Sequence, residues 1–163
     1  RVQIRRLLLR AAQQKTIPIV NYNDPVSDEE NRKMELAIRR SHGDQVVECV
    51  DNDETAAVIA NLVHAKKLVL MTSTEGIYRD PADPETLVEQ VTAKSMEELE
   101  EKVRQLQESC VGASRAGANG AKAKLEYALK SARQGTMVII GHARHRLSDL
   151  VEGRVACTRI GLE

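Results

Sequence analysis

The chain has 163 residues, neither Phe nor Trp, and 24 basic side chains against 24 acidic ones. A net charge of zero gives no long-range field that would favour nucleic acid or an anionic membrane, and no apolar run is long enough to cross a bilayer. The length suits a single domain with an aliphatic core. Three widely spaced cysteines make no disulfide framework, which favours a reducing, cytoplasmic compartment.

The first residues read at once as a helix, predicted over 2–14, and the chain begins with Arg1 rather than methionine. A sequence that starts inside a helix is typical of part of a longer protein. We therefore expect residues 1–163 to form one portion of a domain that is truncated at its N-terminus.

A short apolar run at 17–21 predicts a buried strand. Asn23 and Asp24 follow it, where they could hold a ligand amine or simply form a turn before a proline. Residues 27–45 are highly charged and predict an exposed excursion with a modest helical tendency, and residues 45–49 could form the next strand.

The most informative stretch begins with the polar triplet Asp51-Asn52-Asp53. It precedes a helix predicted over 54–65 and a buried strand predicted over 67–72, with a glycine turn at Gly76. The triplet could be only a helix cap with favourable acidic charge, although three polar groups exceed what a cap needs. Ligands of open α/β sheets bind outside the carboxyl ends of strands, so this stretch is a candidate site.

In the second half of the chain, predicted strands alternate with predicted helices. The predictions are an edge strand at 86–91, a helix opened by the capping box Ser95 to Glu98, a glycine-rich loop at 112–120, a helix at 121–133, a strand at 136–140, a short helix at 146–151 and a last strand at 154–159. Such alternation predicts an α/β fold, with a three-layer, open, largely parallel sheet and helices on both faces.

A second candidate site is the loop that leads into the helix at 121–133. Its residues are Gly117, Ala118, Asn119, Gly120, Ala121, Lys122, Ala123 and Lys124. Glycines let backbone N–H groups turn inward and a helix start adds partial positive charge, and both suit phosphate. Lys122 and Lys124 should point in different directions, one toward a phosphoryl group and one toward solvent. The alternative is a flexible linker, and the loop is not a Walker A motif.

The remaining polar residues carry weaker signals. His142 and His145 follow the strand at 136–140 and could contact a ligand. No spacing of histidines or cysteines supports a metal site, and the cysteines are best explained as small core residues.

Taken in order, several of these segments resemble the amino-acid kinase family, and within it most closely the glutamate 5-kinases. The matching segments are 18–24, 51–53, 68–72, 75–78, 117–125, 137–141 and 150–153. The resemblance implies ATP-dependent phosphorylation of the carboxylate of a small amino acid, which gives an acyl phosphate. It also implies Mg²⁺ on the ATP phosphates and a homo-oligomer.

The same resemblance assigns roles to individual residues. Substrate binding falls to Asn23, Asp24 and Asn52, and catalysis to Asp53, which would orient the catalytic lysines, and Lys124, which would stabilise charge on the transferring group. Nucleotide binding falls to Thr72, Ser73, Tyr78 and residues 117–124.

The chain also departs from the family pattern. The N-terminal lysine and glycine segment of the family is not among these residues, Ser73 stands where the family usually has aspartate, and the loop at 117–124 lacks threonine hydroxyls. We therefore expect these residues alone to be a poor catalyst. Two alternatives stay open: a kinase-like binding or regulatory protein without turnover, and a nucleoside monophosphate kinase similar to the uridylate kinases.

Overall fold

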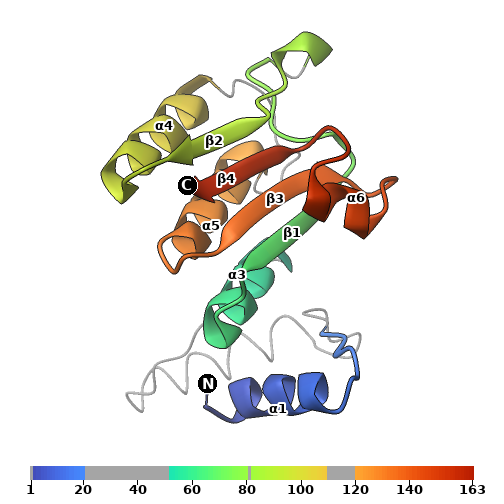
Figure 1. Ribbon diagram of the computed structural model, residues 1–163. Coiled ribbons are helices and arrows are strands. Elements are labelled where there is room, and N and C mark those ends of the chain that lie inside the picture. Colours follow the sequence, from blue (N-terminus) through green and yellow to red (C-terminus); the bar gives the residue numbers. More distant parts are fainter. Residues whose placement is uncertain (1, 21–51, 81, 110–119) are drawn as a thin grey trace, which may run out of the picture.

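The computed structural model describes residues 2–20, 52–80, 82–109 and 120–163 (Figure 1). The elements in chain order are α1 (Val2–Gln13), α3 (Asn52–Val63), β1 (Lys67–Thr72), the 3-10 helix η1 (Pro84–Thr86), β2 (Gln90–Ala93), α4 (Met96–Ser109), α5 (Gly120–Ala132), β3 (Met137–His142), α6 (Leu147–Glu152) and β4 (Thr158–Leu162). Helices and strands are interspersed along the chain, which confirms the predicted α/β class.

The sheet has four strands in the order β1-β3-β4-β2. β1 pairs with β3 in parallel, and so does β2 with β4, whereas β3 and β4 are antiparallel. The largely parallel sheet is therefore confirmed, with one antiparallel junction at its centre. Within the described part of the chain, β2 is an edge strand, as predicted.

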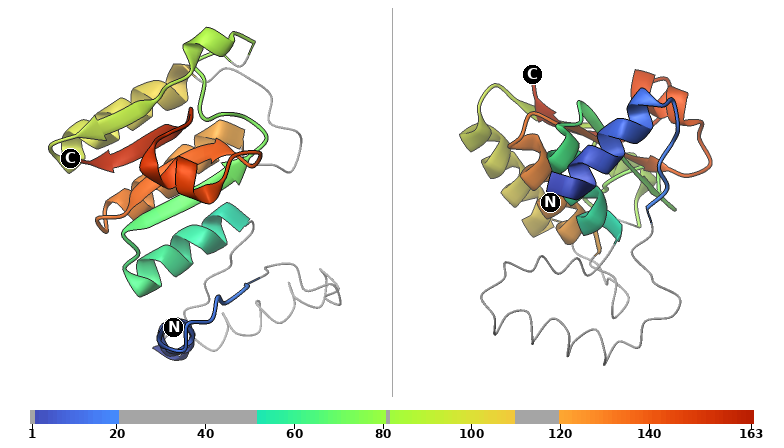
Figure 2. Two further views of the ribbon diagram at one scale, coloured as in Figure 1. Left: turned by 45° about the vertical axis from the view of Figure 1, so that its right-hand side comes forward. Right: turned by 90° about the horizontal axis from the view of Figure 1, so that it is seen from below.

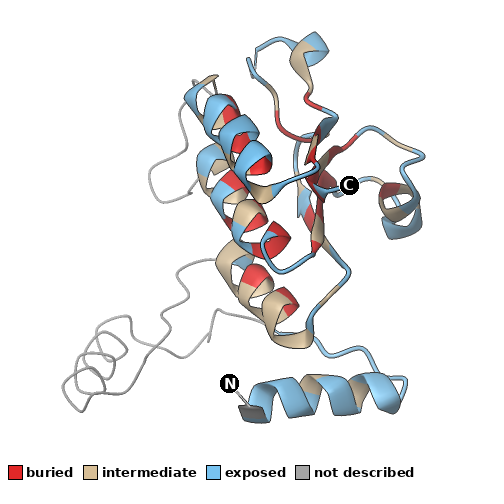
Figure 3. Cartoon of the chain, turned by 60° about the vertical axis from the view of Figure 1, so that its left-hand side comes forward, coloured by how far each residue is buried: buried red, intermediate tan, exposed pale blue. Residues whose placement is uncertain are grey.

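Each strand sends alternate side chains to opposite faces of this sheet. On β3, Val138 and Ile140 belong to the main core, while Ile139 packs with Leu150 of α6 and with Cys157 on the other face. Helices α3, α4 and α5 cover the first face and α6 covers the second (Figures 1 and 3). Both faces carry helices, so the three-layer prediction is confirmed.

The capping box at the start of α4 forms with a small difference from the prediction. The backbone N–H of Glu98 donates to Ser95 Oγ at 3.2 Å, while Glu98 Oε2 accepts from the backbone N–H of Lys94, not Ser95, at 3.3 Å. The helix buries Leu99, Val103 and Leu106, whose spacing of four and three residues places them on one face.

The predicted strand at 17–21 is wrong for residues 17–20, which adopt no regular structure. Ile17 and Ile19 are 89% and 94% exposed. A strand needs a neighbouring edge, and residues 17–20 pair with no strand that the structure describes. Helix α1 lies beside α3, where Arg5 Nε donates to the carbonyl of Leu62 at 3.0 Å (Figure 2).

Two further strand boundaries differ from their predictions. The edge strand predicted at 86–91 begins later and spans Gln90–Ala93. The residues just before it form η1 instead, which Asp83 caps, since its Oδ1 accepts from the N–H of Glu85 at 2.9 Å. The last strand, predicted at 154–159, is Thr158–Leu162. Arg154 instead lies directly after the C-terminal end of α6, where its backbone N–H donates to Asp149 O at 2.9 Å.

Some predictions fall outside the described residues. They concern the excursion at 27–45, the strand at 45–49, Asn23, Asp24, Gly117, Ala118 and Asn119. Where the chain is described, no helix combines the length and the apolar character needed to cross a membrane.

Candidate active site

The starts of α3 and α5 lie at one edge of the sheet. Helix α3 ends shortly before β1 and helix α5 ends shortly before β3, so each helix begins near the edge where its following strand ends. β1 and β3 are parallel neighbours, and their carboxyl ends therefore share this edge. Ligands in open α/β sheets bind there.

An ion pair connects the two helix starts. Lys124 Nζ donates to Asp53 Oδ2, and the two side chains are 24% and 26% exposed. Asp53 is favourable at the positive end of α3, whereas α5 has no acidic residue in its first turn. A lysine near a helix start is opposed by the helix dipole. Asp53 therefore stabilises a cation that α5 alone would disfavour.

The two lysines of α5 point in different directions, as their spacing predicts. Lys122 is exposed and Lys124 is half-buried against Asp53. Backbone N–H groups at the start of a helix have no partner within the helix, so the first turn from Gly120 offers donors beside Lys124. Asn52 is exposed at the start of α3, next to Asp53. Their roles in binding and catalysis remain predictions.

The residues predicted to face the nucleotide follow β1. Thr72 is the last residue of β1 and lies opposite His142 in the register of β1 and β3. Strand alternation places Thr72 on the same face as Leu70, which is part of the core under α3, α4 and α5. Ser73 is exposed, and Tyr78 forms an isolated bridge with Leu87 further along the loop.

A charged cluster at the same edge joins the loops after β1 and β3. Glu75 Oε1 accepts from Arg144 Nη2, and Glu75 Oε2 lies 2.6 Å from His145 Nε2. The N–H of Arg144 donates to His142 Nδ1 at 3.0 Å. Burial raises the pKa of Glu75, but the His145 hydrogen bond and the Arg144 charge outweigh it and hold the pKa below its usual value.

Sequence reasoning missed Glu75 as a partner of these residues. It predicted His142 and His145 as possible ligand contacts, which stays untested, but 70 residues separate His145 from Glu75. No local pattern indicates a contact at that separation.

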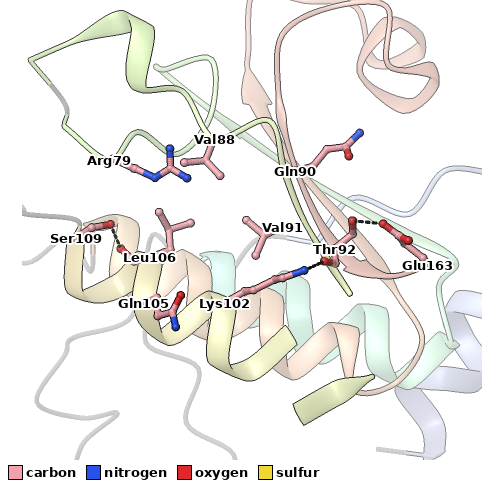
Figure 4. Close-up of a pocket in the computed structure, with 10 residues that line it drawn as sticks. All are labelled: Arg79, Val88, Gln90, Val91, Thr92, Lys102, Gln105, Leu106, Ser109 and Glu163. Atoms are coloured by element: carbon pink, nitrogen blue, oxygen red, sulfur yellow. Dashed lines mark hydrogen bonds between the residues drawn. The ribbon is translucent and has the colours of Figure 1, made fainter. Parts of the chain in front are cut away.

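A groove of about 520 Å³ lies between α4 and β2 (Figure 4). Its size suits a small molecule. Much of its polar lining is already paired, since Lys102 Nζ donates to Thr92 O at 2.8 Å and Thr92 Oγ1 donates to Glu163 Oε1 at 2.6 Å. β2 is also the strand furthest from β1 in the sheet. The carboxyl edge of β1 and β3 is therefore the stronger candidate.

Known proteins resemble this chain in sequence and in fold. The model of the amino acid kinase family matches residues 1–142. The chain is 31% identical over 151 residues to a glutamate 5-kinase of Gloeobacter violaceus and 32% identical over 149 residues to one of Geobacillus kaustophilus. These matches cover 90% of this chain but 35% and 34% of the relatives, so the chain spans about a third of their length.

A solved structure has a similar fold. Carbamate kinase from Giardia lamblia bound to AMP-PNP superposes with a TM-score of 0.53 at 18% identity, over 69% of this chain and 32% of that protein. This likeness shows a shared fold. The family model and the sequence matches lead to one conclusion: the chain belongs to the amino acid kinase family.

Proposed function

We propose that this chain carries part of the phosphoryl-transfer site of an ATP-dependent kinase whose acceptor is the carboxylate of a small amino acid. The observation that carries the proposal is the pair Asp53–Lys124, which joins two helix starts at the carboxyl edge of β1 and β3. Relatives named glutamate 5-kinase, matched over 90% of the chain, favour glutamate as the acceptor.

The proposed reaction is an in-line displacement at phosphorus. A carboxylate oxygen of the acceptor attacks the γ-phosphorus of ATP, the bond from that phosphorus to the β,γ-bridging oxygen breaks, and ADP leaves with the electron pair. The products are an acyl phosphate and ADP. Such a reaction needs positioning and charge stabilisation more than covalent help from the protein.

Lys124 is suited to the charge-stabilising role. Its ammonium group is held by Asp53, and both side chains are partly buried. A transferring phosphoryl group would become a second anionic partner for the same ammonium. Asp53 then acts as a positioning residue that keeps Lys124 aimed at the edge of the sheet.

The start of α5 fits the phosphates of the nucleotide. The N–H groups and the positive dipole of a helix start favour anions. Mg²⁺ would assist by neutralising charge on ATP. No three His, Cys, Asp or Glu side chains of the described residues lie together as a metal site.

The remaining assignments follow the family resemblance. Asn52, exposed beside Asp53, would contact the amino acid, together with Asn23 and Asp24. Thr72, Ser73 and Tyr78 would line the part of the site that binds the nucleotide.

The proposal is tested by trapping the acyl phosphate. The full-length protein is incubated with Mg²⁺, ATP and hydroxylamine, and with glutamate, aspartate or N-acetylglutamate in parallel. We expect a hydroxamate to form with one of these acids and ADP to appear in equal amount. Bound ATP without hydroxamate from any acid would contradict the proposal.

A second candidate is a nucleotide-binding protein without turnover. It is favoured by Ser73, which is exposed where the family usually has aspartate, and by Ala118 and Ala123, which stand in the sequence where the family has threonine hydroxyls. Calorimetry with ATP and Mg²⁺ separates the two: binding without ADP release supports this candidate. ADP release with UMP but with no acid would instead indicate a nucleoside monophosphate kinase.

A further inference from the structure

The loop that leaves β1 is fixed to the sheet at both of its ends. At one end, the N–H of Ala143 donates to Thr72 O at 2.8 Å. At the other, the N–H of Ile77 donates to Thr158 Oγ1 at 2.8 Å. Gly76 packs so closely there that an added Cβ would lie 2.9 Å from the backbone nitrogen of Thr158.

Glu75 supplies a side-chain anchor between these two ends. Its carboxylate uses one oxygen for Arg144 and the other for His145, and its side chain is 17% exposed. Arg144 and His145 are adjacent in the turn that follows β3, and the N–H of His145 donates to His142 O at 3.1 Å within that turn. One carboxylate therefore ties the loop after β1 to the loop after β3.

We propose that Glu75 is a positioning residue that, through Arg144 and His145, holds the loop of Ser73 in the conformation that binds the nucleotide. This inference rests on the proposed function, because it assumes that the nucleotide binds at the carboxyl end of β1. It goes beyond that function in naming a link that neither family resemblance nor local sequence indicates.

The physical reason is the position of Ser73 between two anchors. Thr72 is fixed by the sheet and Glu75 by two charge-assisted contacts, which leaves the Ser73 backbone little freedom. Loss of the Glu75 charge frees residues 73–75 while Thr72 and Gly76 stay in place. A loop that must be ordered again on binding lowers ligand affinity. Since Lys124 lies on a separate helix, the rate at saturating ATP should change little.

The test measures ATP affinity by calorimetry in the full-length protein with Mg²⁺. The variants are Glu75→Gln, Arg144→Gln and the double variant, with Glu100→Gln as matched control. Glu100 pairs with Arg133 at 2.8 Å, an ion pair between α4 and the end of α5. Arg144 is 64% exposed, so its variant tests the link without a risk to folding.

We expect either single change to weaken ATP binding about tenfold, and the double variant to bind no more weakly than the singles, as contacting residues behave. Glu100→Gln should bind like the unchanged protein, and kcat of all variants should stay within a few-fold. Equal ATP affinity in Arg144→Gln, Glu75→Gln and the unchanged protein would overturn the positioning role. If the double variant lost ATP affinity by the product of the two single losses, the claim that Glu75 acts through Arg144 would be overturned. If the unchanged protein binds no ATP, the proposed function itself is wrong and this inference with it.

Discussion

Asp53 and Lys124 form an ion pair across 71 residues of sequence. Each residue comes from a different helix start, and both helices begin at the edge where two parallel strands end. The pair thus brings a carboxylate and an ammonium group to the position where α/β sheets bind ligands. The two predicted catalytic residues meet in the structure, and the predictions below test whether they act together.

Replacement of Asp53 by Asn should lower the turnover rate far more than the stability. Lys124 loses its charged partner and its fixed direction, and a misplaced group can cost about 10²-fold in rate. A partly exposed ion pair contributes only about 0–1 kcal/mol to folding, so the free energy of unfolding should change by less than about 1 kcal/mol. Rate and urea unfolding are measured on the same preparation.

The matched control for Asp53→Asn is Glu126→Gln. Glu126 pairs with Lys130 at 2.8 Å on the exposed side of α5. The Glu126→Gln variant should have the same turnover rate as the unchanged protein. Equal rates for Asp53→Asn and Glu126→Gln would show that the partner of Lys124 is irrelevant to turnover.

Thr158→Val should destabilise the fold. The Thr158 hydroxyl is fully buried, accepts from the N–H of Ile77 at 2.8 Å and donates to Val88 O at 2.6 Å. Valine keeps the shape but leaves a buried donor and a buried acceptor unpaired, which costs about 1–3 kcal/mol each. Urea unfolding should show this loss, whereas Thr92→Val, at a less buried hydroxyl, should be milder. Equal effects at both positions would contradict the role given to Thr158.

Gly76→Ala should also destabilise, for a steric reason. Its added methyl would press on the backbone of Thr158, which cannot move without disturbing β4. Overpacking of this kind costs about 1–3 kcal/mol. A thermal unfolding midpoint equal to that of the unchanged protein would show that the loop yields freely.

The contribution of Glu75 to stability should depend on pH. Its pKa in the fold lies below its usual value of 4.5, so the unfolded chain takes up the proton first on acidification. The stabilisation is therefore fully present above about pH 4.5 and is lost as the pH falls through the lowered pKa. The difference in unfolding free energy between the unchanged protein and Glu75→Gln should shrink over that range. A difference that stays constant with pH would contradict the pairing with Arg144 and His145.

Local sequence patterns predicted most of this fold because the elements follow from short-range physics. The spacing of Leu99, Val103 and Leu106 defines the buried face of α4, and Ser95 marks its start. The apolar run of β3 likewise identifies a strand buried on both faces. These signals lie within a few residues of one another and need no knowledge of tertiary contacts.

The failures concern contacts between distant residues. Ile17 and Ile19 have the composition of a strand, but a strand forms only where another edge is available. Arg154 reads as part of a strand, yet its hydrogen bonds to Asp149 keep it at the end of α6. The same limit explains why Lys124 and Asp53 were found through the family resemblance. The resemblance includes Glu75 only as part of segment 75–78 and gives it no partner, so its contacts with Arg144 and His145 were missed.

The most direct test of the central claim compares Lys124→Ala with Lys122→Ala in the full-length protein. Both lysines lie near the start of α5, but only Lys124 pairs with Asp53. The rate of hydroxamate formation and the affinity for ATP are measured for each variant. We predict that Lys124→Ala lowers kcat by about 10²–10³-fold with only a few-fold loss of ATP affinity, because its charge acts in the transition state. Lys122→Ala should stay near the unchanged protein. Equal rates for the two variants, or losses of rate and affinity in the same proportion for Lys124→Ala, would contradict the claim.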